Sequence, residues 1–261
     1  MYRDKETEAS YTYLEKVIRH LDRPICLLGG WAVYLLVNPL FKAERGYPYL
    51  GSRDIDLGFD DVETMKRAIA KLTELGFKRV SFRYFKELHS ETLKELDAEE
   101  AKRTALPYIF PMYVDLIMSR AGPSLASRLG FAPIDEPLLR YAFDDAKHRK
   151  EIGEFGKNII LPSPALLLAM KVRSAAGRDK EHKRIKDLCD IAALCLYSGI
   201  GIELLREEAA RYLREAEWRK NLGAVDAEDI RTAARVLALD EGVLGSLVGR
   251  LREPLRGKGG R

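Results

Sequence analysis

Two aspartates, Asp54 and Asp56, stand two positions apart in an apolar segment that ends at Phe59. Alternate residues of a strand project from the same face, so both carboxylates would share one face while Ile55 and Leu57 point into a core. Two neighbouring like charges repel each other unless a cation neutralises them. Carboxylates suit Mg²⁺, which takes one or two of them and completes its shell with water and substrate phosphate. The pair predicts a metal site; the alternative is a solvated strand end.

A third aspartate, Asp115, lies within the apolar segment 113–118. A carboxylate among buried strand residues is costly to desolvate without a partner, although an edge strand could turn it toward solvent. Three carboxylates on neighbouring strands could hold two Mg²⁺ ions, or Mn²⁺ in their place, one at an attacking oxygen and one at a leaving pyrophosphate. The sequence therefore predicts Asp54, Asp56 and Asp115 as metal ligands and catalytic residues.

A pair of glycines, Gly29 and Gly30, follows the short apolar segment Ile25–Leu28 and precedes Trp31. Glycine lets the backbone approach a ligand closely, and the free N–H groups at the start of a helix attract phosphate. Most Gly-Gly pairs are simple turns, so this pair indicates a phosphate site only together with the aspartates.

Elements that would position these residues follow from apolar periodicity and from turn residues. The predicted strands are 25–28, 54–59, 78–89, 113–118 and 159–161. The predicted helices are 11–20, 31–37, 62–75, 166–175, 181–197, 203–217 and 227–237, with 91–103 as a loop or loose helix. The sequence thus predicts an α/β (α+β) fold: a small mixed-sheet domain over 1–160, an all-helical domain over 161–255, and a disordered basic tail over 256–261.

The motifs Leu28-Gly29-Gly30-Trp31 and Ser52-Arg53-Asp54-Ile55-Asp56-Leu57, followed by a strand aspartate, resemble the polymerase-β-like nucleotidyltransferase superfamily. The resemblance implies that Gly29 and Gly30 hold the triphosphate of an NTP. It implies that the two motif aspartates bind metal and that Asp115 is the third carboxylate and the base. Ser52 and Arg53, which open the second motif, are predicted nucleotide-binding residues.

The C-terminal half is similar to the AbiEii nucleotidyltransferase toxin family. The similarity rests on Lys171 and Arg178, which would share one helix face, and on Lys186-Asp187-Leu188-Cys189-Asp190, all after Leu161-Pro162-Ser163-Pro164. It spans residues 25–195. The resemblance implies that Lys171 contacts nucleotide phosphates, with Arg178 beside it, and that Asp187 or Asp190 contributes to the site. The alternative is a surface ion-pair network, because Lys186 and Asp190 at i, i+4 attract each other regardless of function.

The composition limits the classes of partner that the chain could bind. The chain has 261 residues, of which 46% are hydrophobic and 32% charged, as expected for a folded protein. Its formal net charge of +4 permits a polyanionic partner without demanding one. Seven basic residues crowd one stretch and predict an RNA surface, with a solvated charged face or contact with the phosphates of the NTP as the alternatives. They are Lys171, Arg173, Arg178, Lys180, Lys183, Arg184 and Lys186.

Three cysteines without a Cys-x-x-Cys pair indicate a reducing cytoplasm. The charged first residues do not resemble a signal peptide. The uncharged run 24–41 is broken by glycine, asparagine and proline, so we expect a buried strand–turn–helix there and no membrane segment.

These observations predict a metal-dependent nucleotidyltransferase that moves an NMP from an NTP to an acceptor hydroxyl. The AbiEii resemblance implies a toxin with an RNA acceptor, such as tRNA, and an antitoxin partner. Two rivals stay open. The same motifs resemble aminoglycoside and lincosamide nucleotidyltransferases, which modify small antibiotics. A non-catalytic nucleotide-binding module is the other rival, although a dead site has no reason to keep clustered carboxylates.

Overall fold

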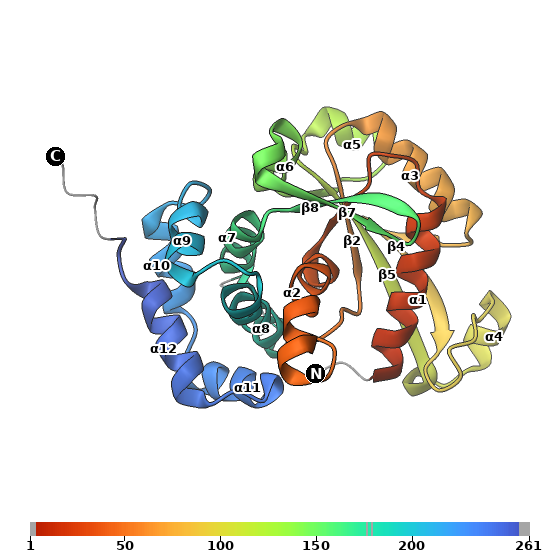
Figure 1. The fold of residues 1–261 in the computed structure, drawn as a ribbon. Coiled ribbons are helices and arrows are strands. Elements are labelled where there is room, and N and C mark those ends of the chain that lie inside the picture. The colour runs from red at the N-terminus through yellow and green to blue at the C-terminus, as the bar shows by residue number, and fades with distance from the viewer. Residues whose placement is uncertain (1–3, 176, 179, 256–261) are drawn as a thin grey trace. The chain divides into compact units, whose positions relative to one another are not determined.

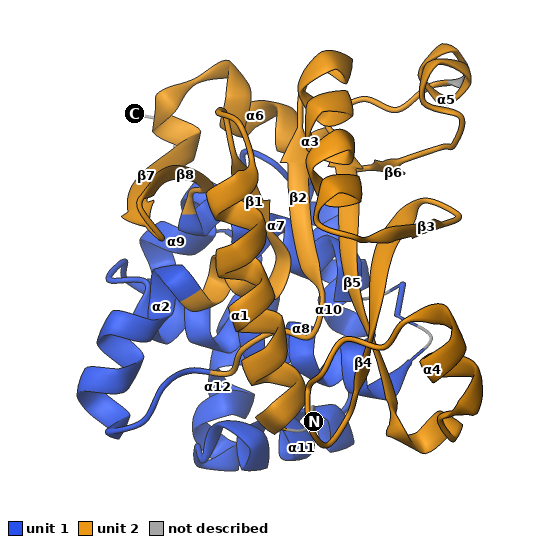
Figure 2. Cartoon of the chain, turned by 90° about the vertical axis from the view of Figure 1, so that its right-hand side faces the viewer, with its two compact units in different colours: residues 1, 35–49, 164–261 blue, residues 2–34, 50–163 orange. Residues whose placement is uncertain are grey.

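The computed structural model describes residues 4–175, 177–178 and 180–255 (Figure 1). The predicted tail over 256–261 lies outside the described residues. Contacts divide the chain into two units, which Figure 2 colours separately. The sheet unit comprises residues 2–34 and 50–163, and the helical unit comprises residues 1, 35–49 and 164–261.

A mixed sheet forms the centre of the sheet unit, as the sequence predicted. Its strand order is β3-β4-β5-β2-β1-β8-β7, with β6 paired to β5. The strands are β1 (Cys26–Leu28), β2 (Ile55–Phe59), β3 (Lys78–Val80), β4 (Arg83–His89), β5 (Ile109–Met118), β6 (Ile134–Asp135), β7 (Arg149–Glu154) and β8 (Lys157–Pro162). Strands β2 and β5 run parallel, as do β1 and β8 and the short β5 and β6 pair, while the other pairs are antiparallel.

Helices of the sheet unit connect these strands, and α3 packs on β2 (Figure 1). They are α1 (Asp4–His20), α3 (Val62–Glu74), α4 (Ala98–Arg103), α5 (Pro123–Leu129) and α6 (Arg140–Asp144), with short 3-10 turns at Leu106–Tyr108, Pro137–Leu139 and Ala146–His148. Amphipathic α3 begins at Asp61, whose side chain accepts a hydrogen bond from the Thr64 backbone N–H and so caps the helix.

Helix α2 (Gly29–Arg45) begins in the sheet unit and ends in the helical unit. It extends the predicted helix 31–37 at both ends and passes through Pro39. Buried Val37 and Phe41 are four residues apart, so the apolar face continues across the proline and keeps the chain helical. The sequence prediction ended this helix too early, because it treated Asn38-Pro39 as a break.

The helical unit contains α7 (Pro164–Ala175), α8 (Glu181–Tyr197), α9 (Ile202–Ala209), α10 (Glu215–Gly223), α11 (Ala227–Leu237) and α12 (Glu241–Arg252). Helix α7 packs against α8, α9 and α10, and α8 also packs against α11. Both α7 and α8 are buried on most sides, which differs from the one-sided burial of a surface helix. Any charged side chain on their inner faces therefore needs a partner within the protein.

Two further predicted elements are each divided into two in the structure. The single strand expected over 78–89 is a hairpin of β3 and β4, because Ser81 adopts a left-handed φ of +54° that turns the chain. The single helix expected over 203–217 is split into α9 and α10, since the chain turns after Ala209 and buries Leu213 before helix resumes at Glu215.

The three cysteines are buried free thiols at Cys26, Cys189 and Cys195. Within the described ranges, no helix is both long and apolar enough to cross a membrane.

Candidate functional site

Strand register in the sheet unit aligns two of the predicted carboxylates. Strands β2 and β5 pair in parallel with Asp56 opposite Asp115. Directly paired residues project from the same face of a sheet. Asp54 immediately precedes β2, two residues before Asp56, and contacts the same Arg83 side chain as Asp115. Asp115 is 8% exposed, whereas the other two side chains are partly exposed. The three aspartates therefore form one group, which we name the carboxylate cluster.

Arg83 on β4 pairs with the carboxylate cluster, and sequence reasoning missed it. Its backbone lies opposite Asp115 in the antiparallel β4–β5 ladder. Arg83 Nε donates to Asp115 Oδ1 at 2.7 Å, and Nη2 donates to Asp115 Oδ2 at 2.8 Å. The same Nη2 lies 3.3 Å from Asp54 Oδ2. One guanidinium thus binds one aspartate with a two-pronged fork and reaches a second.

The environment of Arg83 fixes its side chain further. The guanidinium carbon lies 3.9 Å from the centre of the Tyr113 ring, within the range of a cation–π contact. Burial by itself lowers the pKa of Arg83. The hydrogen bonds to Asp115 and the negative charge of Asp115 outweigh burial and raise the pKa above its usual value. No sequence motif marks Arg83, because its pairing depends on the register between two strands.

Gly29 at the start of α2 lies directly against Asp56. A Cβ placed on Gly29 would lie 1.8 Å from Asp56 Oδ2, and the φ of Gly29 is +62°. A side chain at this position is excluded by both space and backbone conformation. The glycine therefore lets a carboxylate approach the helix start, where the partial positive charge of the backbone favours an anion. Contact of Gly29 with triphosphate stays a prediction.

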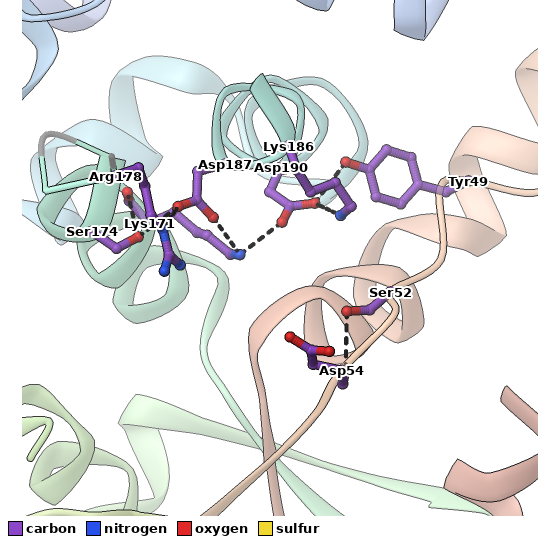
Figure 3. Close-up of polar contacts among 9 residues, drawn as sticks. All are labelled: Tyr49, Ser52, Asp54, Lys171, Ser174, Arg178, Lys186, Asp187 and Asp190. Carbon is purple, nitrogen blue, oxygen red and sulfur yellow. Dashed lines mark hydrogen bonds and ion pairs between the residues drawn. The ribbon is translucent and has the colours of Figure 1, made fainter. Parts of the chain in front are cut away.

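The other predicted nucleotide-binding residues of the sheet unit, Ser52 and Arg53, differ from Gly29 in their surroundings. Ser52 is buried and its hydroxyl donates to the backbone oxygen of Asp54 at 3.0 Å (Figure 3). Arg53 stacks on Phe110, 4.9 Å from the ring centre. Phe110 is five residues from Asp115 on one continuous strand, so the two side chains point to opposite faces. Arg53 therefore contacts the face away from the carboxylate cluster.

The donor set of the carboxylate cluster fits a divalent ion held by few protein ligands. In the part of the chain that the structure describes, no group of three or more His, Cys, Asp or Glu side chains is arranged to hold a metal ion. Mg²⁺ needs only one or two protein carboxylates when substrate phosphate and water supply the rest. Asp54 and Asp56 meet that smaller requirement, whereas both oxygens of Asp115 accept hydrogen bonds from Arg83.

A second charged group lies within the helical unit and centres on Lys171 of α7 (Figure 3). Lys171 Nζ lies 2.9 Å from Asp187 Oδ1 and 2.8 Å from Asp190 Oδ2, both on α8. Asp187 Oδ2 also accepts from the Ser174 hydroxyl at 3.0 Å and from Arg178 Nε at 2.8 Å. We name this group the buried ion network.

Asp190 completes the network with two further partners. Lys186 Nζ donates to Asp190 Oδ1 at 2.5 Å, one turn earlier on α8. The Tyr49 hydroxyl donates to the same oxygen at 2.8 Å, and the Tyr49 ring is 3% exposed. Burial, and after it the charge of Asp190, raises the pKa of Tyr49 well above its usual value. Tyr49 is a second site residue that the sequence did not mark.

Burial overturns the interpretation of these charges as a surface ion-pair network. Lys171 is 8% exposed, Asp187 2% and Asp190 0%. Burial would raise the pKa of Asp187, but Lys171 and then Arg178 lower it to about 2. Burial would likewise lower the pKa of Lys171, but the two aspartates raise it. The structure brings all four predicted residues of this half together, and it engages both candidate aspartates.

Two predictions about the basic residues need correction. Helix α7 ends at Ala175, so Arg178 lies in the following turn and does not share a helix face with Lys171. The seven basic residues do not form one exposed surface, because Lys171 and Lys186 are buried and Arg184 binds Asp229 with two nitrogens. Arg173 and Lys180 are exposed members of the set.

A comparison with curated proteins found no match. Among solved structures, the chain is similar to the crystal structure of an antigenic nucleotidyltransferase-like protein from Paracoccidioides brasiliensis. The identity is 15% over 94% of this chain and 92% of that chain, with a TM-score of 0.41.

A family model described as "Nucleotidyl transferase AbiEii toxin, Type IV TA system" matches residues 51–243, more than half of the 261 residues. The matched region contains the carboxylate cluster, Arg83 and the α7–α8 part of the buried ion network, while Gly29 and Gly30 precede it. The resemblance drawn from the sequence is confirmed. The chain belongs to the AbiEii nucleotidyl transferase toxin family of type IV toxin–antitoxin systems.

Proposed function

We propose that this chain transfers a nucleoside monophosphate from an NTP to an acceptor hydroxyl in a reaction that requires Mg²⁺, with Mn²⁺ as a substitute. The observation that carries the proposal is the alignment of Asp56 with Asp115 on adjacent parallel strands, with Asp54 joined to Asp115 through Arg83. Family membership supplies the reaction class. The cluster supplies carboxylate oxygens as ligands for the divalent ion that accompanies the triphosphate.

The reaction exchanges one phosphoester bond for another. The acceptor oxygen attacks the α-phosphorus, the bond from that phosphorus to the bridging oxygen breaks, and pyrophosphate leaves with the electron pair. Asp54 and Asp56 would hold the metal, which supplies positive charge to the triphosphate oxygens. Asp115 is poorly placed to act as the base, because both of its oxygens accept from Arg83. We assign its role to charge and positioning, and the acceptor proton to solvent or to the pyrophosphate.

In the helical unit we assign different roles to the two predicted phosphate ligands. Arg178 has a side chain that is 38% exposed, so it can meet an anion while Asp187 orients it. Lys171 is buried between two aspartates, so we assign it to ordering the network. Gly29 and Gly30 stay candidates for backbone contact with the triphosphate.

RNA, and tRNA in particular, is the acceptor that we propose, with an antitoxin protein as the partner. The family description supports the toxin–antitoxin assignment. Net charge of +4 and the exposed Arg173 and Lys180 favour a polyanionic acceptor over a neutral drug. The experiment below reads the transfer reaction and the acceptor separately.

The test is transfer of α-³²P label from each of the four NTPs, with Mg²⁺, onto total tRNA. Asp56→Asn is the inactivating variant, because it keeps the shape of the side chain and removes its charge. Asp22→Asn is the matched control, since Asp22 is an exposed aspartate of the same unit. We expect label on tRNA with the wild type and with Asp22→Asn, and none with Asp56→Asn or with EDTA.

Other outcomes separate the rivals. Label on an aminoglycoside or lincosamide but not on RNA would refute RNA as the acceptor and support the transfer reaction itself. Metal-dependent NTP binding without label on any acceptor would favour the non-catalytic module. Equal labelling by the wild type and Asp56→Asn would refute the role of the carboxylate cluster.

A further inference from the structure

One face of the paired strands β4 and β5 continues from the carboxylate cluster and carries two aromatic side chains. Burial alternates along both strands, so that one face is packed in the core and the other is partly exposed. Arg83 and Asp115 are directly paired on the second face, and Phe85 and Tyr113 form the next pair on it. The two pairs are about 7 Å apart along the strands. Phe85 and Tyr113, which we name the ring pair, therefore lie beside the carboxylate cluster.

The ring pair is held by contacts within the sheet. The two ring centres are 6.3 Å apart, with an angle of 39° between the ring planes. The Arg83 guanidinium carbon lies 3.9 Å from the centre of the Tyr113 ring and orders that ring by a cation–π contact. Both side chains of the pair are still partly exposed. Partly exposed rings in fixed positions on a sheet are the kind of surface on which proteins stack unpaired nucleobases.

The charges of this face favour contact with bases over contact with phosphates. Glu87 is the next residue of β4 on the face, where it pairs with Pro111 and is partly exposed. A carboxylate in this position disfavours a phosphate backbone that follows the strands. Bases are planar and uncharged, and they stack on rings whatever their sequence. The face therefore suits the base of a nucleotide whose phosphates lie elsewhere.

The strand order places the ring pair on the acceptor side of the proposed reaction. The strands run β4-β5-β2-β1 across the sheet, and Gly29 follows β1 and lies against Asp56. In the proposed reaction the triphosphate contacts Gly29 and Gly30, on the β1 side of the metal-binding aspartates. The attacking oxygen lies in line with the departing pyrophosphate, so the acceptor enters from the opposite side. That side is formed by β5 and β4, which carry the ring pair.

We propose that Phe85 and Tyr113 stack on an unpaired base close to the acceptor hydroxyl of a single-stranded RNA 3′ end. This inference rests on the proposed function, because it names the form of RNA that the same site accepts. A base inside a duplex is already stacked between its neighbours, so a paired end fits the rings poorly. Phe85 is the better residue to replace, since loss of the Tyr113 ring would also release Arg83 from its contact.

The experiment measures binding of a short single-stranded RNA, labelled at its 5′ end, to the full chain by fluorescence anisotropy with Mg²⁺ and without NTP. In a matched series, each nucleotide near the 3′ end is replaced in turn by an abasic one, which keeps the sugar and phosphate and lacks the base. We expect loss of the stacked base to weaken binding to the wild type by about 5–150-fold, the contribution of one base–aromatic contact. Abasic replacement elsewhere in the series should have less effect.

Substitutions at position 85 connect that loss to the ring. Phe85→Leu keeps an apolar side chain without a ring and should lose most of the discrimination between intact and abasic RNA. Phe85→Trp, with a larger ring, should widen the discrimination. Phe155→Leu is the matched control, because Phe155 is a partly exposed ring in the turn between β7 and β8, at the opposite edge of the sheet. It should discriminate as the wild type does.

Failure of this inference differs from failure of the proposed function. Equal binding of intact and abasic RNA by the wild type would overturn the stacking, as would unchanged discrimination in folded Phe85→Leu. If Phe85→Leu does not fold, unchanged discrimination in Phe85→Trp would overturn it. Weaker binding of any NTP by Phe85→Leu, with RNA binding unchanged, would assign the rings to the NTP base and overturn the proposal. The binding assay contains no transfer step, so label transfer tests the proposed function separately.

Discussion

The carboxylate cluster and the buried ion network arrange their charges in opposite ways. In the sheet unit, one arginine, Arg83, pairs with Asp115 and Asp54 of the carboxylate cluster. In the helical unit, Lys171, Lys186 and Arg178 surround two aspartates. Two members of the first group, Asp54 and Asp56, are partly exposed. Both aspartates of the second group are buried between their cations.

This contrast teaches how to separate charges that serve function from charges that serve the fold. A buried and compensated network loses stability when one partner is removed, because the others become unpaired charges in a low-dielectric interior. A partly exposed cluster of like charges loses ligand binding when a member is removed, and can even gain stability from relief of repulsion. The two groups should therefore respond differently to equally small substitutions.

Lys171→Met should have the largest effect on stability. It removes the cation shared by Asp187 and Asp190 and should lower the free energy of unfolding by about 3–5 kcal/mol. Lys180→Met, at an exposed lysine of the same unit, should change it by less than about 0.5 kcal/mol. Urea unfolding followed by circular dichroism measures both.

The double variant Lys171→Met/Asp187→Asn tests that result. It removes the stranded Asp187 charge along with the lysine and leaves Asp190 paired with Lys186, so most of the lost stability should return. A double variant no more stable than Lys171→Met would mean that packing of the lysine stem, and not charge compensation, explains the loss.

Asp56→Asn should show the opposite behaviour. We expect label transfer to fall by at least about 10²–10³-fold, the size of effect seen when one charge-stabilising group of an active site is removed. The free energy of unfolding should change by less than about 1 kcal/mol, since the substitution relieves repulsion with Asp115. A large loss of both stability and activity would show that Asp56 is required for folding. The carboxylate cluster and the buried ion network would then not differ in the way described.

How much of this could be predicted from the sequence differs between the two groups. The spacing of Asp54 and Asp56 and their apolar neighbours were enough to predict a strand with both carboxylates on one face. The alternation of side chains along a strand is a local property that can be read from the sequence. Helix α8 was predicted with its observed bounds, since apolar residues recur along it at helical spacing, as at Ile185, Leu188 and Ile191. The positions of Lys171, Asp187 and Asp190 followed from the family resemblance, although their burial did not.

The partners of these residues were beyond local patterns. Arg83 and Asp115 are 32 residues apart in the sequence and come together through the register of strands β4 and β5. Tyr49 and Asp190 are 141 residues apart. Strand β7 was missed because its charged residues form no apolar alternation and pair only with β8 as an antiparallel neighbour. These contacts depend on pairing between segments that are far apart in the chain. Local patterns in a single sequence do not predict that pairing.

The pH dependence of stability gives a smaller effect confined to the helical unit. Lys171 and Arg178 lower the pKa of buried Asp187 from 3.8 to about 2. A depressed pKa contributes stability above the unfolded-state pKa, and this contribution is lost as the pH falls through the folded-state pKa. The gap corresponds to about 2.5 kcal/mol at neutral pH. The difference in unfolding free energy between the wild type and Asp187→Asn should therefore shrink by about that amount between pH 5 and pH 2. Parallel profiles of the two proteins over this range would contradict the role of Asp187.

Tyr49→Phe should have the smallest effect and tests how completely the network compensates itself. The substitution removes one hydrogen bond to Asp190, which keeps Lys186 and Lys171 as partners. We expect a loss of about 1.5 kcal/mol, the low end for a hydrogen bond to a charged group, because no charge is left unpaired. Tyr47→Phe is the matched control, since Tyr47 is 45% exposed in the same loop and should change stability by less than about 0.5 kcal/mol. A loss near that of Lys171→Met would show that Asp190 depends on Tyr49 as much as on its lysines, and the network would then be less self-sufficient than its ion pairs indicate.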